Sequence, residues 1–335
     1  MSDPLEILQR IHGVRVLVVG DIMLDKYSWC AVERISPEAP VPVATLREET
    51  YVPGGCGNVA ANVISLGGQA DVCSVVGGGY YGQVLADTLR DYGVDSHSLI
   101  PEPGRTTTVK NRIVAGSQQM MRMDRERATP LTPGQETRFL AAVESAVARA
   151  DACVISDYAK GVVTPRVSQA VIRQALSRGI PIVVDPKGHD YEKYRGATII
   201  TPNTPELFQS LSLPFDRNAD IQALSQQLRD RIGVEVVLTT RGAEGMSLLI
   251  EDGAYITIPT IARQVSDVTG AGDTVVAMLA LSLGAGADPE QAALLSNVAA
   301  GVVVAKLGTA TVSQQEVIDH LERSQLKGSK QVPRS

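Results

Sequence analysis

Short aliphatic segments alternate with segments of helical character along most of the chain, and this alternation is the strongest constraint on its fold. The first aliphatic segment covers residues 14–19 and leads directly into Gly20 and Asp21. Further strands are expected at residues 71–76, 152–156, 182–185, 198–200 and 236–240, with a hairpin at 245–258. Helices are expected at residues 81–92, 133–149, 165–178, 218–232, 271–284, 289–305 and 313–324. This order predicts an α/β fold in which helices cover both faces of a mostly parallel sheet.

Two stretches interrupt the alternation. Residues 26–53 and 105–124 are rich in β-branched side chains and alternate polar with apolar residues, which is typical of strands. In the first stretch, Pro37, Pro40 and Pro42 divide the pattern into what we expect to be short strands. We interpret both insertions as one small β-sheet that forms a lid over the strand ends. The remaining expectation is a single domain over residues 1–325, followed by a frayed polar tail at 326–335.

The composition limits the partners and the compartment of the protein. Hydrophobic residues make up 44% of the chain and aromatic residues only 4%, so the core must be aliphatic. A net charge of −6 argues against nucleic acid or an anionic membrane as the main partner. No apolar run approaches the roughly 20 residues of a membrane helix, and no secretory leader is visible. Four cysteines without Cys-x-x-Cys spacing and four histidines without zinc-site spacing predict a cytoplasmic protein with reduced thiols.

The octet at residues 267–274 reads Asp-Val-Thr-Gly-Ala-Gly-Asp-Thr and precedes an apolar helical segment. A glycine turn that enters a helix leaves backbone N–H groups free at the positive end of the helix dipole, which creates an anion site. We assign Gly270, Ala271 and Gly272 to this anion hole. Asp273 is either an ordinary first-turn residue or a general base that takes a proton from a hydroxyl attacking a phosphoryl group. We favour the base, because a carboxylate beside an anion site is unfavourable unless it has a function.

Further polar residues follow the strands, where ligands bind in parallel sheets. The segment at 203–206 places an amide and a carboxylate one helical turn apart, which fits a capping box. Glu206 is equally suited to hold water on a Mg²⁺ ion that bridges nucleotide phosphates. The loop at 239–245 fits either the phosphates or ribose of a nucleotide or a plain hairpin connection. Together the nucleotide-side candidates are Asn203, Thr204, Pro205, Glu206, Thr239, Arg241, Gly242, Gly245 and Asn297.

Two charged residues have two interpretations each. Lys187 follows Asp185 and Pro186, and is either a cation beside bound phosphates or part of a solvated turn. Asp267 precedes the anion turn by three residues. It either orients backbone carbonyls around a monovalent cation such as K⁺ or caps the turn.

A second glycine turn, Gly54-Gly55-Cys56-Gly57-Asn58, opens an alanine-rich helix. This turn is either a tight strand-to-helix connection or a place where the main chain approaches a ligand, with Asn58 bonding sugar hydroxyls. We favour the ligand because Asp25 lies on the preceding segment. The Gly-x-Gly-x-x-Gly match at residues 77–82 does not follow the first strand, so it is weak evidence for a dinucleotide site. The chain also lacks a P-loop motif.

With these motifs the chain is identified as a member of the ribokinase-like (PfkB-type) carbohydrate kinases. The octet at 267–274, the Asn-x-x-Glu element at 203–206 and the Gly-Gly-x-x-Asn element at 54–58 match the family signatures in the expected order. Narrower stretches resemble bacterial heptose-phosphate kinases, and they cover residues 20–27, 34–43, 156–161, 185–188, 194–198 and 301–309. The resemblance extends from about residue 14 to 320.

The resemblance implies ATP- and Mg²⁺-dependent phosphorylation of the anomeric hydroxyl of D-glycero-β-D-manno-heptose 7-phosphate. The 1,7-bisphosphate would serve the synthesis of nucleotide-activated heptose and lipopolysaccharide core. By position the resemblance implies that Asp273 is the catalytic base. It also implies that the sugar is bound by Asp25, Arg34, Gly54, Gly55 and Asn58. Many relatives also carry a nucleotidyltransferase domain with a His-x-x-His-type motif. Because no second histidine lies at that spacing from His320 in the sequence, we expect kinase activity alone.

A sugar phosphate brings negative charge into a protein that is itself negative, so nearby cations are expected to bind it. The candidates are Arg34, Arg105, Lys110, Arg112 and Lys187. The alternative is that these are solvated surface charges. The exposed strand edges of the lid predict a homodimer in which two small sheets pack together. Another sugar or nucleoside kinase, a nicotinamide oxidoreductase and an inactive sugar-binding module remain as alternative functions.

Overall fold

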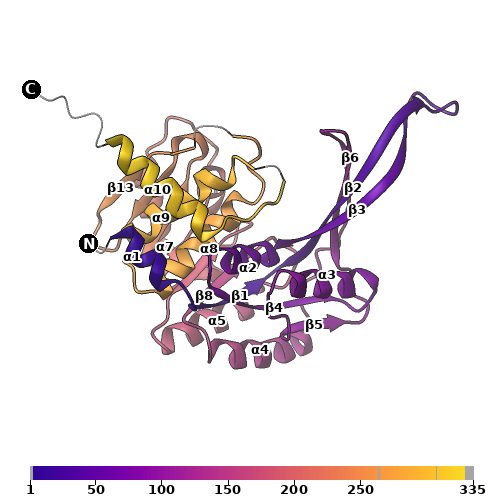
Figure 1. The fold of residues 1–335 in the computed structure, drawn as a ribbon. Coiled ribbons are helices and arrows are strands. Elements are labelled where there is room, and N and C mark those ends of the chain that lie inside the picture. Colours follow the sequence, from indigo (N-terminus) through magenta and orange to yellow (C-terminus); the bar gives the residue numbers. More distant parts are fainter. Residues whose placement is uncertain (1–2, 263–264, 307, 329–335) are drawn as a thin grey trace, which may run out of the picture.

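The computed structural model describes residues 3–262, 265–306 and 308–328, and its main feature is a large sheet (Figure 1). Nine strands follow one another in the order β13-β12-β11-β10-β9-β8-β1-β4-β5. Neighbours from β11 to β5 are parallel, whereas β12 and β13 add an antiparallel edge. The strands are β1 (Arg15–Gly20), β4 (Gln69–Gly77), β5 (Leu99–Glu102), β8 (Ala152–Ser156), β9 (Ile182–Asp185), β10 (Ile199–Ile200), β11 (Val236–Thr240), β12 (Met246–Leu249) and β13 (Tyr255–Ile258).

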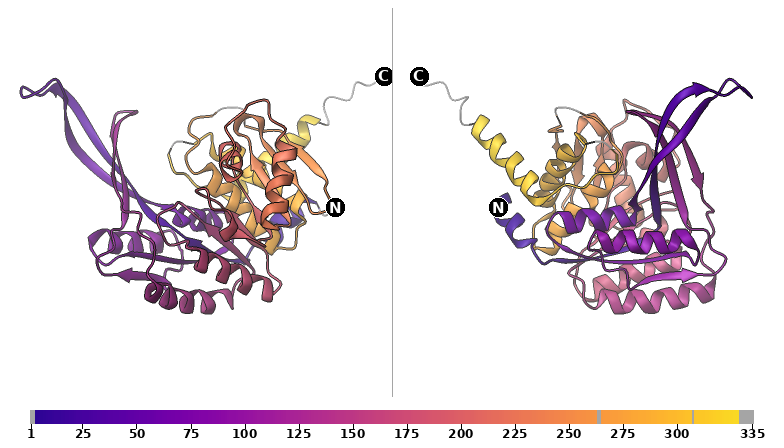
Figure 2. Two further views of the ribbon diagram at one scale, coloured as in Figure 1. Left: turned by 180° about the vertical axis from the view of Figure 1, so that it is seen from behind. Right: turned by 45° about the vertical axis from the view of Figure 1, so that its right-hand side comes forward.

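Helices cover both faces of this sheet, as Figure 2 shows from two sides. One face carries α1 (Pro4–Arg10), α2 (Cys56–Ser65), α3 (Tyr80–Asp91), α8 (Ala271–Gly284), α9 (Pro289–Val303) and α10 (Gln314–Gly328). The other carries α4 (Pro133–Val147), α5 (Pro165–Ser177), α6 (Thr204–Ser210) and α7 (Ile221–Ile232). Alternate side chains of β1 enter the two cores, because successive residues of a strand point to opposite faces: Val16 and Val18 enter one, Leu17 and Val19 the other. The doubly covered, mostly parallel sheet is therefore confirmed.

A second, smaller sheet has the strand order β3-β2-β6-β7. It combines β2 (Ile22–Ile35) and β3 (Pro42–Gly55) with β6 (Thr108–Ala115) and β7 (Gln118–Arg125), so segments distant in sequence form one sheet as expected. The expectation of short strands was wrong, because β2 and β3 have 14 residues each. Pro37 and Pro40 lie in the connection between them, and Pro42 starts β3, where a missing amide is tolerated. The resulting hairpin projects far from the main body (Figure 1).

Some local features were not expected from the sequence. The helix α1 and the edge strand β5 had no clear signal. The helix α10 continues to Gly328, so the expected tail cannot begin at 326, and residues 329–335 lie outside the described part of the chain. None of the described helices is long and apolar enough to cross a membrane.

Candidate active site

The turn before α8 has the geometry of an anion site. Gly270 caps α8 with φ 79°, and a Cβ there would lie 2.7 Å from Nδ2 of Asn58. Among the described residues, no backbone carbonyl accepts a hydrogen bond from the N–H of Gly272 or Asp273, so both N–H groups are free. A Cβ on Gly272 would meet no protein atom within 4 Å, and Gly272 lines two adjoining pockets. Protein packing therefore requires the glycine at 270, whereas the glycine at 272 leaves space for a ligand.

This difference predicts opposite effects for two matched substitutions. Gly270→Ala places a side chain in the left-handed region, and we expect it to lower the free energy of unfolding by about 1–2 kcal/mol. Gly272→Ala lies in the first helical turn with open space around it, so we expect normal stability but weaker ATP binding. Thermal unfolding and calorimetric titration with ATP measure the two effects. Unchanged ATP affinity in Gly272→Ala would contradict the role of this glycine as ligand space.

Asp273 lies in the first turn of α8 and is only 4% exposed. Its Oδ2 accepts a hydrogen bond from Nδ2 of Asn58 at 2.6 Å, and its Oδ1 accepts one from the hydroxyl of Tyr158 at 2.7 Å. Burial raises the pKa of Asp273 to about 6, although the hydrogen bonds from Asn58 and Tyr158 act to lower it. A carboxyl group with this pKa is mostly ionised at neutral pH and close to the optimum for a general base.

Asn58 is itself held by a hydrogen-bond chain inside the core. Asn62, one turn further along α2, donates to the backbone carbonyl of Asn58 at 3.0 Å and to its Oδ1 at 3.3 Å. The hydroxyl of Thr274 donates to Oδ1 of Asn62 at 3.0 Å. This series of hydrogen bonds ends on α8 at Thr274, next to Asp273, so α2 and α8 hold each other's polar side chains in place here.

A large pocket of about 790 Å³ lies on one side of the α8 N-terminus. Its size is typical of a small-molecule or cofactor site. The octet contributes Val268, Ala271 and Gly272 to its lining. Most nucleotide-side candidates also line it: Asn203, Thr204, Pro205, Arg241, Gly242, Gly245 and Asn297. The structure thus brings these residues together around one cavity.

Two nucleotide-side candidates, Thr239 and Glu206, do not line this pocket. The side chain of Thr239 is fully buried, and its hydroxyl lies 3.3 Å from that of Ser225 on α7. The next residue of β11, Thr240, lines the pocket instead. The prediction for Thr239 was wrong by one residue, because adjacent side chains of a strand point to opposite faces.

The segment at 203–206 forms the expected capping box at the start of α6. Oδ1 of Asn203 accepts from the N–H of Glu206 at 2.9 Å, and Oε2 of Glu206 accepts from the N–H of Asn203 at 3.0 Å. The second oxygen, Oε1, accepts from Nζ of Lys187 at 2.7 Å. Lys187 therefore belongs to the Glu206 cluster and not to the lid cations with which the sequence grouped it. Asp185 lines the same small pocket of about 170 Å³ as Glu206.

The carboxylates of this cluster repel one another. Burial raises the pKa of Asp185 well above its usual range, and the nearby charges of Asp273 and Glu206 raise it further. Lys187 supplies a compensating positive charge. The surplus of negative charge suits a cation, and Mg²⁺ is commonly held by one or two carboxylates, waters and substrate phosphates. Among the described residues, no group of three or more His, Cys, Asp or Glu side chains forms a complete protein metal site.

Asp267 accepts hydrogen bonds from two backbone groups. Its Oδ1 accepts from the N–H of Thr269 at 2.9 Å, and its Oδ2 accepts from the N–H of Gly308 at 3.1 Å. Burial would raise the pKa of Asp267, but these hydrogen bonds hold it below its ordinary value. This geometry satisfies the capping interpretation and also joins the turn to the loop at Gly308.

Asp25 and Arg112 form an ion pair in the small sheet with an Nη1–Oδ1 distance of 2.5 Å. Both side chains are almost buried, and the Arg112 guanidinium lies over the ring of Tyr27. A Cβ on Gly54 would come within 2.7 Å of Oδ2 of Asp25, and one on Gly55 within 2.4 Å of the carbonyl of Asp21. The glycines are therefore required by the approach of β2 to β3 and α2. The close approach seen at both glycines is to the protein's own chain, and a ligand contact at this turn stays a prediction.

The other cations expected near the sugar differ in their positions. Lys110 faces the same side of the small sheet as Asp25, its register partner on β2. Its ammonium group has no hydrogen-bond or ion-pair partner among the described residues, and its charge lowers the pKa of Asp273. Arg105 donates to the carbonyls of Thr129 and Lys160 at 3.0 Å each, so it ties two loops together.

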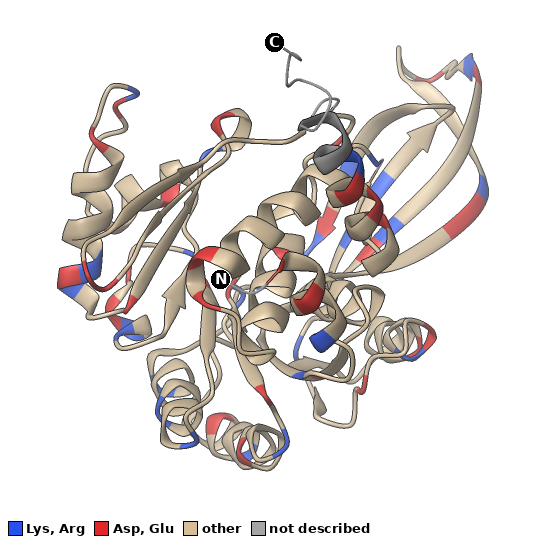
Figure 3. Cartoon of the chain, turned by 60° about the vertical axis from the view of Figure 1, so that its left-hand side comes forward, with Lys and Arg blue, Asp and Glu red and all other residues tan. Residues whose placement is uncertain are grey.

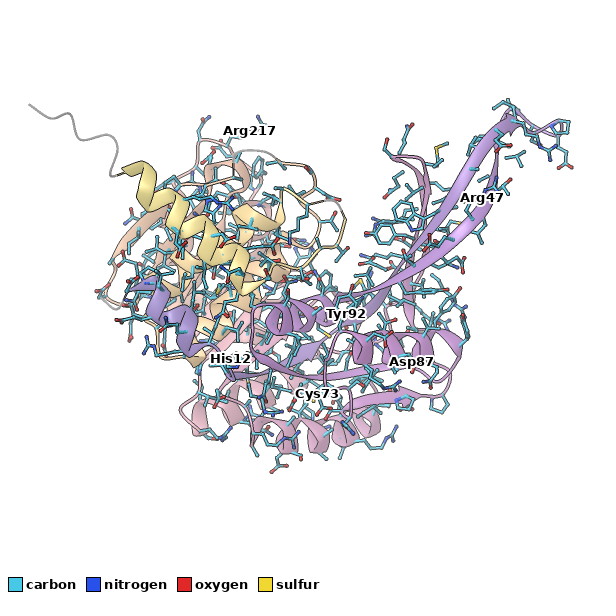
Figure 4. The ribbon with its side chains drawn as sticks, viewed as in Figure 1. His12, Arg47, Cys73, Asp87, Tyr92 and Arg217 are labelled. Carbon is cyan, nitrogen blue, oxygen red and sulfur yellow. The ribbon has the colours of Figure 1, made fainter. Side chains whose placement is uncertain are left out.

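Arg34 lies nine residues beyond Asp25 on β2, roughly 30 Å along an extended strand. Figure 4 shows Arg47, on the neighbouring strand β3, in the outer part of the projecting hairpin. Arg34 pairs in register with Val43, still nearer the tip than Arg47. The structure therefore does not bring Arg34 to the site of its own chain, and it separates Arg34 from Asp25 because the strands are longer than expected.

Two functional-site residues had no assigned role in the sequence analysis, although both follow strands. Tyr158 comes after β8 and contacts Asp273 directly. Asp21 follows β1 and is 1% exposed. Its carboxylate accepts hydrogen bonds from three backbone N–H groups of the loop that contains Tyr158. The rule that ligands bind beyond strand ends gave a signal for both, but it could not say which groups they would contact.

Comparison with known proteins agrees with this geometry. The family model described as "pfkB family carbohydrate kinase" matches residues 15–316 of this chain. The chain is 45% identical over 312 residues to the "Bifunctional protein HldE" of Trichlorobacter lovleyi and 46% identical over 307 residues to that of Geobacter metallireducens. These matches cover 93% and 92% of this chain but 64% and 63% of the relatives, so the chain spans less than two thirds of their length.

Solved structures share the fold at low sequence identity. A putative ribokinase from Agrobacterium tumefaciens has a TM-score of 0.73 at 20% identity, covering 94% of this chain and 99% of that one. The tetrameric inhibited form of phosphofructokinase-2 from Escherichia coli has a TM-score of 0.76 at 19% identity, covering 93% and 99%. The expected ribokinase-like fold is confirmed.

Proposed function

The chain belongs to the pfkB family of carbohydrate kinases, and on this premise we propose that it phosphorylates the anomeric hydroxyl of D-glycero-β-D-manno-heptose 7-phosphate with ATP. The observation that carries the proposal is the position of Asp273. Its buried carboxylate lies at a helix N-terminus, between the large pocket and the small sheet with Asp25 and Lys110. The heptose assignment also draws on the stretches at 20–27, 34–43 and 156–161, which resemble heptose-phosphate kinases.

In the proposed reaction Asp273 removes the proton from the anomeric hydroxyl as the sugar oxygen attacks the γ-phosphorus of ATP. The bond between the γ-phosphorus and the bridging oxygen breaks, and ADP leaves with the electron pair. The free N–H groups of Gly272 and Asp273 stabilise the negative charge on the transferred phosphoryl oxygens. Asn58 and Tyr158 hold the base in place. The sugar hydroxyls are proposed to bind Asp25 and Asn58.

The donor set supports Mg²⁺ as the metal that accompanies ATP. Glu206 and Asp185 are the carboxylates that would hold it, with water and phosphate oxygens completing its coordination. When bound, Mg²⁺ neutralises phosphate charge. Lys187, paired with Glu206, is proposed to lie beside the same phosphates. A monovalent cation such as K⁺ near Asp267 also stays a proposal.

The test of this function is an ADP-release assay against a panel of sugars and sugar phosphates. We expect heptose 7-phosphate to give the highest kcat/KM, and a product phosphorylated at both ends. A preference for ribose, fructose or a nucleoside would assign the chain to another branch of the same family. Oxidation or reduction of NAD(P)H would identify an oxidoreductase, and sugar binding without ADP release an inactive module. The expectation of kinase activity alone stays a prediction.

We also propose that the protein forms a homodimer through the small sheet. Ile35, Val41 and Leu46 on the hairpin are 63%, 51% and 52% exposed, and three methionines of β7 are exposed as well. Lys, Arg, Asp and Glu also lie along these strands (Figure 3), which suits pairing of complementary surfaces. Exposed apolar clusters on projecting strands commonly mark interfaces. Arg34 lies too far along this hairpin for its own site, so a sugar contact from Arg34 would require a second copy.

Substitution of the hairpin tests the dimer. The double variant Ile35→Glu, Leu46→Glu is expected to sediment as a monomer at micromolar concentration, because it places charges in the apolar contact. Phe215→Glu is the matched control, since Phe215 is 56% exposed in the loop after α6, outside the small sheet. The wild type and the control should both be dimers. A monomeric wild type, or a dimer that survives the double substitution, would contradict the proposal.

A further inference from the structure

Tyr158 lies in the loop after β8 and contacts the carboxylate of Asp273. Its hydroxyl donates to Oδ1 at 2.7 Å, while Asn58 donates to Oδ2 at 2.6 Å. An ionised carboxylate has about four acceptor positions, so each oxygen retains room for the hydrogen of a substrate hydroxyl. Burial raises the pKa of the Tyr158 phenol well above its ordinary value, and the neighbouring Asp273 raises it further. Tyr158 therefore remains a protonated donor over the working pH range.

The loop that carries Tyr158 is held in one conformation by a buried acid. Oδ2 of Asp21 accepts from the N–H groups of Tyr158 and Lys160 at 3.0 and 2.9 Å, and Oδ1 accepts from Val162 at 2.9 Å. Between Tyr158 and Lys160, the backbone of Ala159 has φ 55°, in the left-handed region. A non-glycine residue keeps this conformation only where its surroundings over-determine it. The loop is thus built to hold Tyr158 in place.

We propose that Tyr158 is a positioning residue for Asp273, whose phenol keeps the base ionised and in one orientation, and that Asp21 acts through the loop to hold Tyr158. This inference rests on the proposed role of Asp273 as the base. It assigns a function to two side chains that no strand or helix needs for its own backbone hydrogen bonds.

The charges around Asp273 explain why such a donor is needed. Burial is the largest influence and raises its pKa, and the carboxylate of Asp25 on β2 raises it further. Asp185, at the end of β9, is also coupled to Asp273 by like-charge repulsion. Lys110 on β6 and the two hydrogen bonds act in the opposite direction. Removal of one donor therefore moves the pKa of Asp273 upward, away from its present value of about 6.

The experiment is the pH dependence of kcat/KM for Tyr158→Phe, with whichever sugar gives turnover. The wild type should lose activity as the pH falls through about 6, because the base becomes protonated. In Tyr158→Phe we expect this acid limb to move up by about one to two pH units, the usual effect of a hydrogen bond to a charged group. Activity at pH 7 should fall by about two- to tenfold and recover at higher pH, with little change in the KM for ATP.

Tyr194→Phe is the matched control. Tyr194 is a buried tyrosine whose hydroxyl donates to Oδ2 of Asp157 at 2.7 Å, so the control removes the same kind of bond without touching Asp273. Its acid limb should coincide with that of the wild type. Asp21→Asn removes part of the support of the loop and should shift the limb in the same direction as Tyr158→Phe. If Tyr158→Phe folds poorly, the acid limb of Asp21→Asn tests the proposal in its place.

Two outcomes overturn the proposal. One is an unshifted acid limb in both Tyr158→Phe and Asp21→Asn, and the other is a shift of equal size in Tyr194→Phe. If the wild type phosphorylates no sugar, the proposed function fails, and the inference is then read from the carboxyl titration of Asp273 by infrared difference spectroscopy against Asp273→Asn. An Asp273 titration that is the same with and without the Tyr158 hydroxyl would overturn the inference independently.

Discussion

Asp273→Asn is expected to lower kcat by a factor on the order of 10² to 10⁴, the usual contribution of a positioned general base. The substitution is nearly isosteric, and the amide oxygen can still accept one of the two hydrogen bonds from Asn58 and Tyr158. It also removes negative charge from a helix N-terminus that borders the large pocket. ATP binding should therefore be retained or strengthened while turnover is lost.

The difference in folding stability between this variant and the wild type should depend on pH in a defined direction. Because the pKa of Asp273 is raised from 3.8 to about 6 in the folded protein, its ionisation destabilises the folded wild type. This penalty grows as the pH rises from 3.8 to about 6, is complete above that pH, and is absent at lower pH. Asp273→Asn should thus be at least as stable as the wild type at pH 7 to 8. Loss of activity with a normal melting temperature separates a chemical defect from misfolding.

Asp288→Asn is the control for the loss of a carboxylate at a helix start. Asp288 caps α9 and accepts from the N–H of Gln291 at 2.8 Å, a role that asparagine fills equally well. This variant should keep wild-type turnover. Activity of Asp273→Asn within a few-fold of wild type would move the base elsewhere, and Asp267 would be the next candidate.

The sequence predicts the main sheet well because its strands are short, aliphatic and fully buried. Val16 to Val19 form such a run, and burial on both faces leaves no polar position that would suggest another structure. The capping box at 203–206 is equally local, since its two hydrogen bonds close within one helical turn. Local patterns of this kind survive into the fold whatever the tertiary surroundings.

The errors arise where a residue's role depends on its partner in space. Lys187 has an equally plausible sequence interpretation beside a sugar phosphate, and only the arrangement of β9 and α6 pairs it with Glu206. Thr239 and Thr240 are chemically identical, so composition could not decide which one faces the pocket. Tyr158 contacts a residue 115 positions away, and no periodicity encodes such a contact.

The small sheet shows how one misjudged element displaces its residues. The prolines at 37, 40 and 42 look like strand breakers, but they occupy the turn and the first residue of β3. The strands are therefore long enough to carry Arg34 away from Asp25. Strand length is set by pairing across the hairpin, through bulges near Trp29 and Val32, which the sequence of one strand does not record.

Discrimination between a phosphorylated and an unphosphorylated sugar is the second large effect. We expect the wild type to use heptose 7-phosphate with a kcat/KM roughly ten- to a hundredfold above that for free heptose, because each charge-assisted hydrogen bond contributes about 1.5–3 kcal/mol. Lys110 is the cation best placed to form such a hydrogen bond with the phosphate of the sugar. It is half-buried in β6, faces the same side of the sheet as Asp25, and has no described ion-pair partner.

Lys110→Ala should therefore lower kcat/KM for the sugar phosphate roughly ten- to a hundredfold and leave free heptose almost unaffected. Arg112→Ala should behave differently. Arg112 pairs with Asp25 and lies over Tyr27, so its loss leaves a buried carboxylate unpaired and misplaces a proposed sugar contact. It should weaken the use of both sugars to a similar degree. ATP binding should be unchanged in both variants.

Arg90→Ala is the control for a surface cation away from the site. Arg90 pairs with Asp87 on α3 and is largely exposed, so its removal should alter the use of neither substrate. The comparison requires kcat/KM for both sugars in the wild type and all three variants. Equal use of the two sugars by the wild type would remove the heptose-phosphate assignment and leave a plain sugar kinase in its place. A loss in Lys110→Ala that is the same for both sugars would instead assign Lys110 to the transferred phosphoryl group, because its charge already acts on Asp273.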